Sequence, residues 1–209
     1  MPTRISELLA VVPGGIEPKP PVSFEQTEEY REHMRAVRAS RLRKAGLFGE
    51  YAEADTPQGR EAYERSKQGR GTFLFGPCGT GKTLSAACAV RLAVLDGKRA
   101  KLVTAKQLLD SVKAGYDGGD RGALDRAEAY DLLALDDLGV ERSTEWALET
   151  ITRLIDTRTT RQRPTIVTSN YRLGELRDRW GGVPGQRIVS RIAGACERVE
   201  MGGEDWRLK

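Results

Sequence analysis

The most constraining feature of this sequence is the run at residues 76–83, which reads Gly-Pro-Cys-Gly-Thr-Gly-Lys-Thr. It matches the pattern G-x-x-x-x-G-K-[ST] at every fixed position. A β-rich run, 72–75, precedes it, and an apolar stretch with helical periodicity, 82–95, follows it. In that setting, backbone N–H groups and the positive end of a helix converge on one point, and glycines let phosphate oxygens approach the backbone closely. The run therefore predicts a phosphate-binding loop within an α/β fold.

The residue types in the loop also predict its ligands, ATP and Mg²⁺. Lys82 is expected to neutralise the β- and γ-phosphates, and the hydroxyl of Thr83 is placed to ligate Mg²⁺. Cys78 occupies a variable position, where we assign it no redox role. The predicted nucleotide-binding residues are Gly76, Pro77, Cys78, Gly79, Thr80, Gly81, Lys82, Thr83 and Leu84.

From residue 71 onwards, short apolar runs alternate with helical periods, which is typical of βαβ units and a parallel sheet. We expect five strands, at 72–75, 100–104, 132–135, 165–168 and 197–201. We expect helices near 82–95, 105–115, 143–160 and 185–194, and a turn-rich insertion at 117–126. The predicted fold is a three-layer αβα arrangement around a five-stranded parallel sheet.

Polar side chains follow two of these strands at the points where the strands end. Asp136 and Asp137 follow the apolar run 132–135, and Asn170 follows the run 165–168. The carboxyl ends of parallel strands gather ligand groups at one edge of a sheet. We predict that Asp136 holds Mg²⁺ and that Asp137 polarises an attacking water as general base, with Asn170 reaching the γ-phosphate or that water. An ordinary solvated turn is the alternative for each of these polar ends.

The N-terminal part of the chain has a different character. Four of the nine prolines fall within residues 13–22, which predicts a tether, and residues 24–45 form a charge-dense helical pattern. We therefore divide the chain into an arm, 1–45, and a domain, 46–209. The arm is expected to bind a partner and to become ordered on contact, although a solvated helix without a partner explains it almost as well.

Composition excludes several classes of protein. No run approaches the roughly 18–20 apolar residues of a membrane helix. The three cysteines are odd in number and lack C-x-x-C spacing, which argues against a disulfide framework or a cysteine zinc site. We expect a cytoplasmic protein. The net charge is +4, and residues 157–209 carry 11 basic against 6 acidic side chains, which permits a nucleic-acid partner.

Taken together, these motifs resemble those of the AAA+ ATPases, and most of all the DnaC/IstB group of helicase loaders and transposition helpers. The resemblance covers about residues 71–207. It is carried by the phosphate-binding loop, Asp136-Asp137-Leu138-Gly139, Trp146, Pro164-Thr165-Ile166, Thr168-Ser169-Asn170-Tyr171, Arg187-Ile188-Val189-Ser190-Arg191 and Glu204-Asp205-Trp206-Arg207.

The resemblance implies further roles. Asn170 would be the sensor of the γ-phosphate, and Arg191 would be an arginine finger that enters the ATP site of a neighbouring subunit. Arg187, one helical turn earlier, and Arg207 are additional basic candidates. Asp137 stands where most AAA+ proteins carry Glu, and its shorter side chain would suit slow hydrolysis. With eight residues after position 201, we expect no helical lid domain of the kind that many AAA+ proteins carry.

The resemblance also implies partners. We expect an ATPase, slow and stimulated by assembly, that helps load a replicative helicase onto single-stranded DNA. The candidate DNA contacts are Lys106, Lys113 and Tyr116, for which a plain amphipathic surface helix is the alternative. Three other functions remain open: a transposition helper that binds duplex DNA and a transposase, an ATP-binding switch with negligible hydrolysis, and a small-molecule kinase.

Overall fold

The computed structural model describes residues 27–116, 118–140 and 144–203. Residues 37–209 form a compact unit that is separate from residues 1–36. The helix α1, Glu28–Lys44, crosses this boundary, and its first part lies in the smaller unit. The predicted tether, 13–22, and Glu204 to Arg207 of the resemblance lie outside the described residues.

The boundary of the compact unit falls earlier than the division after residue 45 that the sequence suggested. The last turns of α1 belong to the larger unit, because Leu42 and Ala45 are buried there with Leu47 and Leu102. The backbone N–H of Leu102 also donates a hydrogen bond to the carbonyl of Ala45 at 2.8 Å. The partner-binding role of the arm stays a prediction.

The larger unit contains a five-stranded parallel sheet with the strand order β2-β3-β4-β1-β5. The strands are β1 Gly71–Phe75, β2 Ala100–Thr104, β3 Leu132–Asp136, β4 Thr165–Ser169 and β5 Cys196–Glu200. All five strands were predicted, each with its ends within one residue of those observed. The predicted fold class is confirmed.

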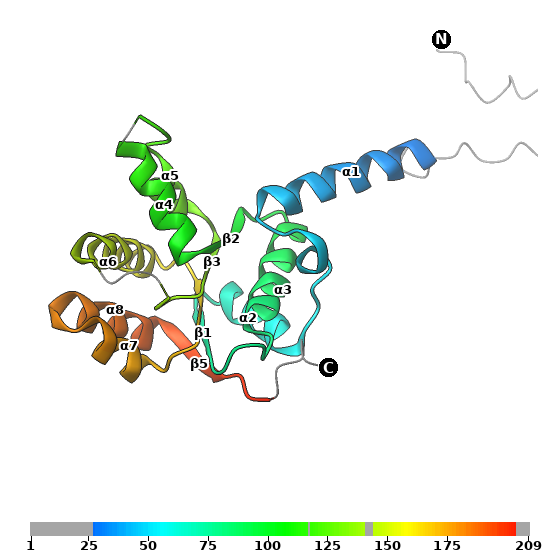
Figure 1. The fold of residues 1–209 in the computed structure, drawn as a ribbon. Helices are drawn as coiled ribbons and strands as arrows, with labels where there is room; N and C mark the ends of the chain where they lie inside the picture. Colours follow the sequence, from blue (N-terminus) through cyan, green and yellow to red (C-terminus); the bar gives the residue numbers. More distant parts are fainter. Residues whose placement is uncertain (1–26, 117, 141–143, 204–209) are drawn as a thin grey trace, which may run out of the picture. The chain divides into compact units, whose positions relative to one another are not determined.

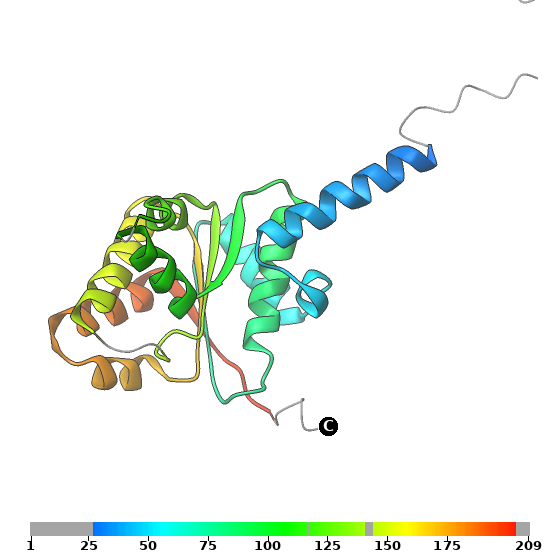
Figure 2. The same cartoon turned by 45° about the horizontal axis from the view of Figure 1, so that its top comes forward.

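Helices cover both faces of this sheet (Figure 1). On one face lie α2 Pro57–Lys67 and α3 Lys82–Leu95, preceded by the short helix η3 Gly49–Ala52. On the other face lie α4 Ala105–Tyr116, α5 Ala123–Ala129, α6 Glu145–Thr160, α7 Leu173–Trp180 and α8 Gly182–Ala195. The tilted view shows the same two helical layers with the strands between them (Figure 2).

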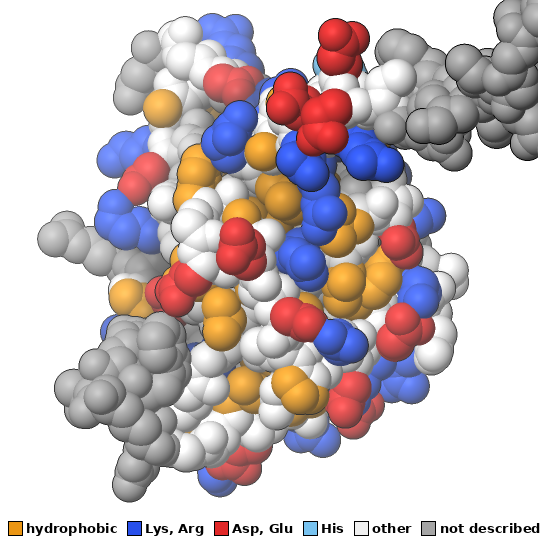
Figure 3. All heavy atoms as spheres, turned by 90° about the vertical axis from the view of Figure 1, so that its right-hand side faces the viewer, with side chains coloured by type: hydrophobic (Ala, Val, Ile, Leu, Met, Phe, Trp, Pro, Cys, Tyr) orange, Lys and Arg blue, Asp and Glu red, His pale blue; other side chains and the backbone are white. Residues whose placement is uncertain are grey.

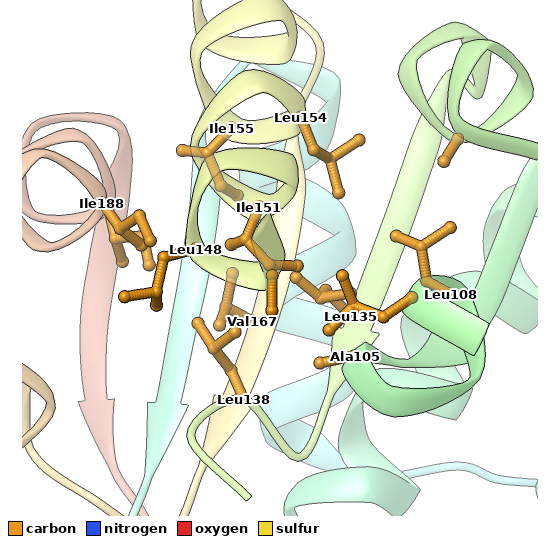
Figure 4. Close-up of a cluster of buried hydrophobic side chains, with 14 of the residues drawn as sticks. Ala105, Leu108, Leu135, Leu138, Leu148, Ile151, Leu154, Ile155, Val167 and Ile188 are labelled. Atoms are coloured by element: carbon orange, nitrogen blue, oxygen red, sulfur yellow. The ribbon is translucent and has the colours of Figure 1, made fainter. Parts of the chain in front are cut away.

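The strand sequences explain this layering. In β1, Phe73 faces the cluster under α4–α8, whereas Leu74 faces the cluster under α2 and α3. In β4, Ile166 and Val167 divide in the same way. Because successive side chains of a strand point to opposite faces, apolar residues on both sides require two covering layers. Figure 4 shows one of the resulting cores, with Val167 and Leu135 beneath Ile151 of α6.

The prediction of a turn-rich insertion at 117–126 is wrong in its second half, where α5 begins at Ala123. Leu124 and Ala127 are buried against the core, so tertiary burial stabilises a helix that the glycine-rich composition around it obscured. Helices α2 and α7 were not predicted at all. α2 carries a start signal in its sequence, because Thr56 caps it with a hydrogen bond from the Gly59 N–H, and Pro57 occupies its first turn.

No helix among the described residues is long and apolar enough to span a membrane. Figure 3 shows one face of the molecule, on which acidic and basic side chains are interspersed among smaller hydrophobic areas.

Candidate active site

The run at residues 76–83 forms a loop between β1 and α3, at the carboxyl edge of the sheet. Gly76, Gly79 and Gly81 have φ angles of 143°, 74° and 83°, a region that side chains with a Cβ atom rarely adopt. At Gly76 a Cβ atom would also lie only 2.1 Å from the carbonyl oxygen of Met201. The glycines of the motif are therefore required by the backbone geometry as well as by the approach of a phosphate.

Lys82 is the first residue of α3 and is only 5 % exposed. Its Nζ atom donates hydrogen bonds to the carbonyl oxygens of Gly76 at 2.8 Å and Pro77 at 2.6 Å. The loop thus wraps around the positive charge of Lys82. This position is the one expected of a lysine that meets phosphate oxygens.

Thr83 and Asp136 lie 53 positions apart in the sequence but are in direct contact. The Thr83 hydroxyl is 3.0 Å from Oδ1 and 3.2 Å from Oδ2 of Asp136, to which it donates. The hydroxyl oxygen of Thr83 and the carboxylate oxygens of Asp136 are metal ligands of the type that Mg²⁺ prefers, together with phosphate oxygens. Within the described residues there is no cluster of three or more His, Cys, Asp or Glu side chains able to hold a metal by themselves. A site with one protein carboxylate and one hydroxyl fits an ion that arrives with the nucleotide.

Thr168 of β4 fixes the pair of acids from the neighbouring strand. Its hydroxyl donates to Oδ1 of Asp136 at 2.6 Å and accepts the backbone N–H of Asp137 at 3.0 Å. Thr168 is fully buried and Asp136 is 4 % exposed, so neither group can exchange these bonds for water. From the sequence, Thr168 was expected only as the last residue of a strand and as part of the resemblance, with no role of its own.

Burial raises the pKa of Asp136 above its usual value, and the neighbouring Asp137 raises it further. Hydrogen bonds from Thr168 and Thr83 and the charge of Lys82 act in the opposite direction. A cation bound beside Asp136 would remove the cost of keeping this buried carboxylate ionised.

Asp137 adopts a φ angle of 54°, in the left-handed region that residues other than glycine rarely occupy. Its backbone is held there by Thr168, and the next residue, Leu138, donates its N–H to the Thr168 carbonyl at 2.9 Å. This strained turn separates the two carboxylates, so that Asp136 is buried while Asp137 is partly exposed.

A cavity of about 990 Å³ joins these groups. It is lined by Lys82, Thr83, Asp136, Asp137 and Asn170, and by Cys78, Gly79, Gly81 and Leu84 of the loop. The structure therefore brings the predicted acid pair, the predicted polar tip and the loop to one site. The cavity also extends past Phe48, Tyr51 and Gln107, which sequence reasoning missed because nothing in the local sequence links them to the loop.

Arg191 does not line this cavity. It lies on α8, where its Nε atom is 2.8 Å from Oδ1 of Asp156 on α6. Arg187, one turn earlier, pairs with Oδ2 of the same carboxylate at 2.7 Å. Both arginines therefore project from the same face of α8, whereas Arg207 lies outside the described residues.

The candidate DNA contacts are spread along α4, and none of the three lines the cavity. Lys106 pairs with Asp110 at 2.6 Å, and Lys113 is exposed. The ring of Tyr116 is 72 % exposed and meets the edge of Trp146 at a centroid distance of 6.5 Å. Their role in DNA binding stays a prediction.

Comparison with known proteins decides the family. The model of the IstB-like ATP binding proteins matches residues 62–209. This chain belongs to that family. It is an AAA+ protein of the DnaC/IstB group, and nucleotide binding is a property of the family.

Individual relatives agree with this assignment. The chain is 30 % identical over 139 residues to YdaV, an uncharacterized protein of Escherichia coli K12, covering 65 % of this chain and 54 % of YdaV. It is 26 % identical to the replicative helicase loader DnaC of Escherichia coli K12, over 58 % of this chain and 49 % of DnaC. The replicative helicase loader DnaI of Bacillus subtilis is also 26 % identical, over 70 % of this chain and 50 % of DnaI. The chain spans about half the length of these curated relatives.

Solved structures show the same fold. The crystal structure of a DnaC helicase loader is similar with a TM-score of 0.60 and 28 % identity, over 69 % of this chain and 86 % of that one. DnaA from Aquifex aeolicus, solved with AMPPCP bound, gives a TM-score of 0.58 and 25 % identity over 70 % of this chain and 47 % of that one. The bound ATP analogue belongs to that structure.

Proposed function

We propose that this protein is a helicase-loader-type ATPase, which binds ATP with Mg²⁺ and hydrolyses it slowly to drive changes between assembled subunits. The observation that carries the proposal is the buried network of Thr83, Asp136 and Thr168 beside Lys82. It holds a positive charge and oxygen ligands at the mouth of a loop that has the geometry of a phosphate site.

Each residue has a distinct role in this proposal. Lys82 neutralises the β- and γ-phosphates, and Thr83 and Asp136 hold Mg²⁺, which supplies charge stabilisation when bound. Asp137 orients and deprotonates the attacking water, and Asn170 contacts the γ-phosphate or that water. Arg191 of a second copy stabilises the charge that develops on the transferred phosphoryl group. The partly exposed Asp137 beside the buried Asp136 supports this division of labour between the acids.

We propose single-stranded DNA and a replicative helicase as partners, because DnaC and DnaI, to which the chain is similar, are named replicative helicase loaders. Lys106, Lys113 and Tyr116 would contact the DNA, and residues 1–36 would contact the helicase. A cytoplasmic location follows from the same proposal. The family description as IstB-like favours one second candidate, a transposition helper that acts on duplex DNA with a transposase.

Purified full-length protein tests the ATPase proposal. Turnover should be measurable with ATP and Mg²⁺, and should rise with protein concentration and with single-stranded DNA. Lys82→Ala should lose binding of a fluorescent ATP analogue. An unchanged affinity of Lys82→Ala would refute the assignment of the site, and negligible turnover under every condition would reduce the protein to an ATP-binding switch.

A second experiment separates the partners. The protein is mixed with the purified replicative helicase and, in a separate sample, with the transposase of the same organism. Complexes are detected as co-eluting proteins in size-exclusion chromatography. Removal of residues 1–36 should abolish helicase binding but leave nucleotide binding intact. This deletion is preferable to removal of residues 1–45, because Leu42 and Ala45 belong to the core. Binding to the transposase alone would favour the second candidate.

A further inference from the structure

A charged cluster lies between the helices α6 and α8. It consists of Arg187 and Arg191 of α8 and Asp156 of α6. Asp156 receives Arg187 on one carboxylate oxygen and Arg191 on the other, at 2.7 Å and 2.8 Å. The aspartate side chain is only 23 % exposed, whereas the two arginine side chains are 57 % and 52 % exposed. One mostly covered acid thus holds two exposed cations, which leaves the cluster with a net positive charge.

The backbone beneath the cluster is anchored. Each charged residue is followed or preceded by a buried isoleucine: Ile155 next to Asp156, Ile188 next to Arg187, and Ile192 next to Arg191. Ile155 and Ile188 lie on facing sides of α6 and α8 (Figure 4). Because protein cores are closely packed, the backbone of residues anchored in them has little freedom to move. The backbone positions from which the three charged side chains project are therefore fixed.

The two arginines use their donors differently. Arg187 commits a terminal atom, Nη2, to the carboxylate. Arg191 approaches through Nε, and its Nη atoms donate no hydrogen bond to any described residue. A guanidinium has five N–H donors in a planar fork, and the outer edge of that fork is what pairs with phosphate oxygens. The terminal N–H groups of Arg191 are therefore not engaged by any described residue, whereas Arg187 uses one of its terminal atoms.

The contact between Asp156 and Arg191 is close but poorly aligned. Oδ1 of Asp156 is shielded from solvent and receives no well-directed hydrogen bond from the described residues, although Nε of Arg191 is 2.8 Å away. Electrostatic attraction holds the guanidinium near this oxygen without consuming its terminal donors.

From this geometry we infer that Asp156 is a positioning residue for Arg191: it holds Nε so that the terminal N–H groups face the nucleotide phosphate of a second copy of the chain. Arg187 anchors the other oxygen of the carboxylate and keeps the acid in place. The inference rests on the proposed ATPase function, and it assigns the role of finger to Arg191 rather than Arg187. Arg191 does not line the cavity of its own chain, which agrees with a role at a phosphate bound by a neighbouring copy.

The first test compares turnover of the full-length protein with that of Asp156→Asn, which keeps the shape of the side chain but removes its charge. Because misplacement of a catalytic group by about 1 Å costs up to about 100-fold in rate, kcat should fall by about tenfold or more. The KM for ATP should stay unchanged, since Asp156 does not touch the cavity. Asp156→Glu, which retains a carboxylate, should recover most of the lost rate.

Asp125→Asn is the matched control. Asp125 pairs with Arg153 of α6 at 2.9 Å, so this variant also removes an exposed ion pair between two helices. Its kcat should equal that of the unmodified protein. An equal loss of rate in both variants would show a general effect of helix packing and would overturn the inference.

The second test uses mixed subunits. Arg191→Ala supplies intact nucleotide sites without a finger, and Lys82→Ala supplies fingers without a working site, so mixing them should restore turnover. The double variant Lys82→Ala/Asp156→Asn should fail to restore it. If the single variant Lys82→Ala fails as well, or if Arg191→Ala is fully active alone, the proposed finger is wrong. If both donors restore turnover equally, the finger stands and the role of Asp156 is refuted.

Discussion

Thr168 offers a sharp test of how the candidate site is held together. Its hydroxyl makes two buried hydrogen bonds, to the Asp136 carboxylate at 2.6 Å and from the Asp137 N–H at 3.0 Å. Thr168→Val removes both bonds and leaves a side chain of similar shape. A hydrogen bond to a charged group contributes about 1.5–3 kcal/mol and one between neutral groups about 1 kcal/mol. The free energy of unfolding should therefore fall by about 3 kcal/mol.

The neighbouring strand provides a matched control. Thr72 of β1 is also fully buried, but its hydroxyl makes no hydrogen bond to any described residue. Thr72→Val should therefore change the free energy of unfolding by less than about 1 kcal/mol, in the stabilising direction, because it removes a buried unsatisfied group. The same substitution, at the same degree of burial, is thus expected to have opposite signs in adjacent strands.

Urea denaturation of both variants, followed by tryptophan fluorescence, measures these differences at a common m-value. For a chain of this size, about 3 kcal/mol corresponds to a drop in Tm of roughly 6–12 °C. A second readout is nucleotide affinity as a function of Mg²⁺. Thr168→Val should need more Mg²⁺, because Asp136 loses a bond that orients it and that lowers its pKa. Equal stabilities for the two variants, with equal Mg²⁺ requirements, would refute the reasoning.

Two further predictions concern the cysteines and a buried arginine. Of the three free thiols, Cys78 is exposed in the loop, whereas burial raises the pKa of Cys196 to about 12 and Cys88 is also buried. Ellman's reagent at pH 8 should therefore modify one thiol quickly, and saturating ATP with Mg²⁺ should slow that reaction; equal rates with and without nucleotide would place the ligand elsewhere. Arg158→Met should cost more than about 3 kcal/mol, because it strands several buried acceptors. These include Thr165 Oγ1 at 2.8 Å and the carbonyls of Ala127 at 2.8 Å and Pro164 at 2.7 Å. Because Arg158 lies near the amino end of β4, the affinity of the variant for nucleotide, measured at low temperature, should be retained. A fall of less than about 1 kcal/mol in the free energy of unfolding in urea would contradict the structural role given to Arg158.

The sequence predicted the nucleotide loop because its geometry is local. The left-handed glycines, the lysine at the start of α3 and the threonine after it follow from eight consecutive residues. The strands were equally accessible, since short apolar runs such as Leu132–Asp136 are buried on both faces. Helix α5 was hidden by the glycines before it, because burial of Leu124 and Ala127 against residues distant in the sequence helps to stabilise it.

What the sequence by itself determined is therefore the fold class and the list of groups at the carboxyl edge of the sheet. It could not determine how those groups are tied together, because the contacts join residues far apart in the chain. Thr168 reaches Asp136 across 32 positions, and Thr83 reaches it across 53. Arg191 and Arg187 meet Asp156 only because α6 and α8 pack side by side. Such pairings depend on strand order and helix packing, and only the tertiary structure decides them.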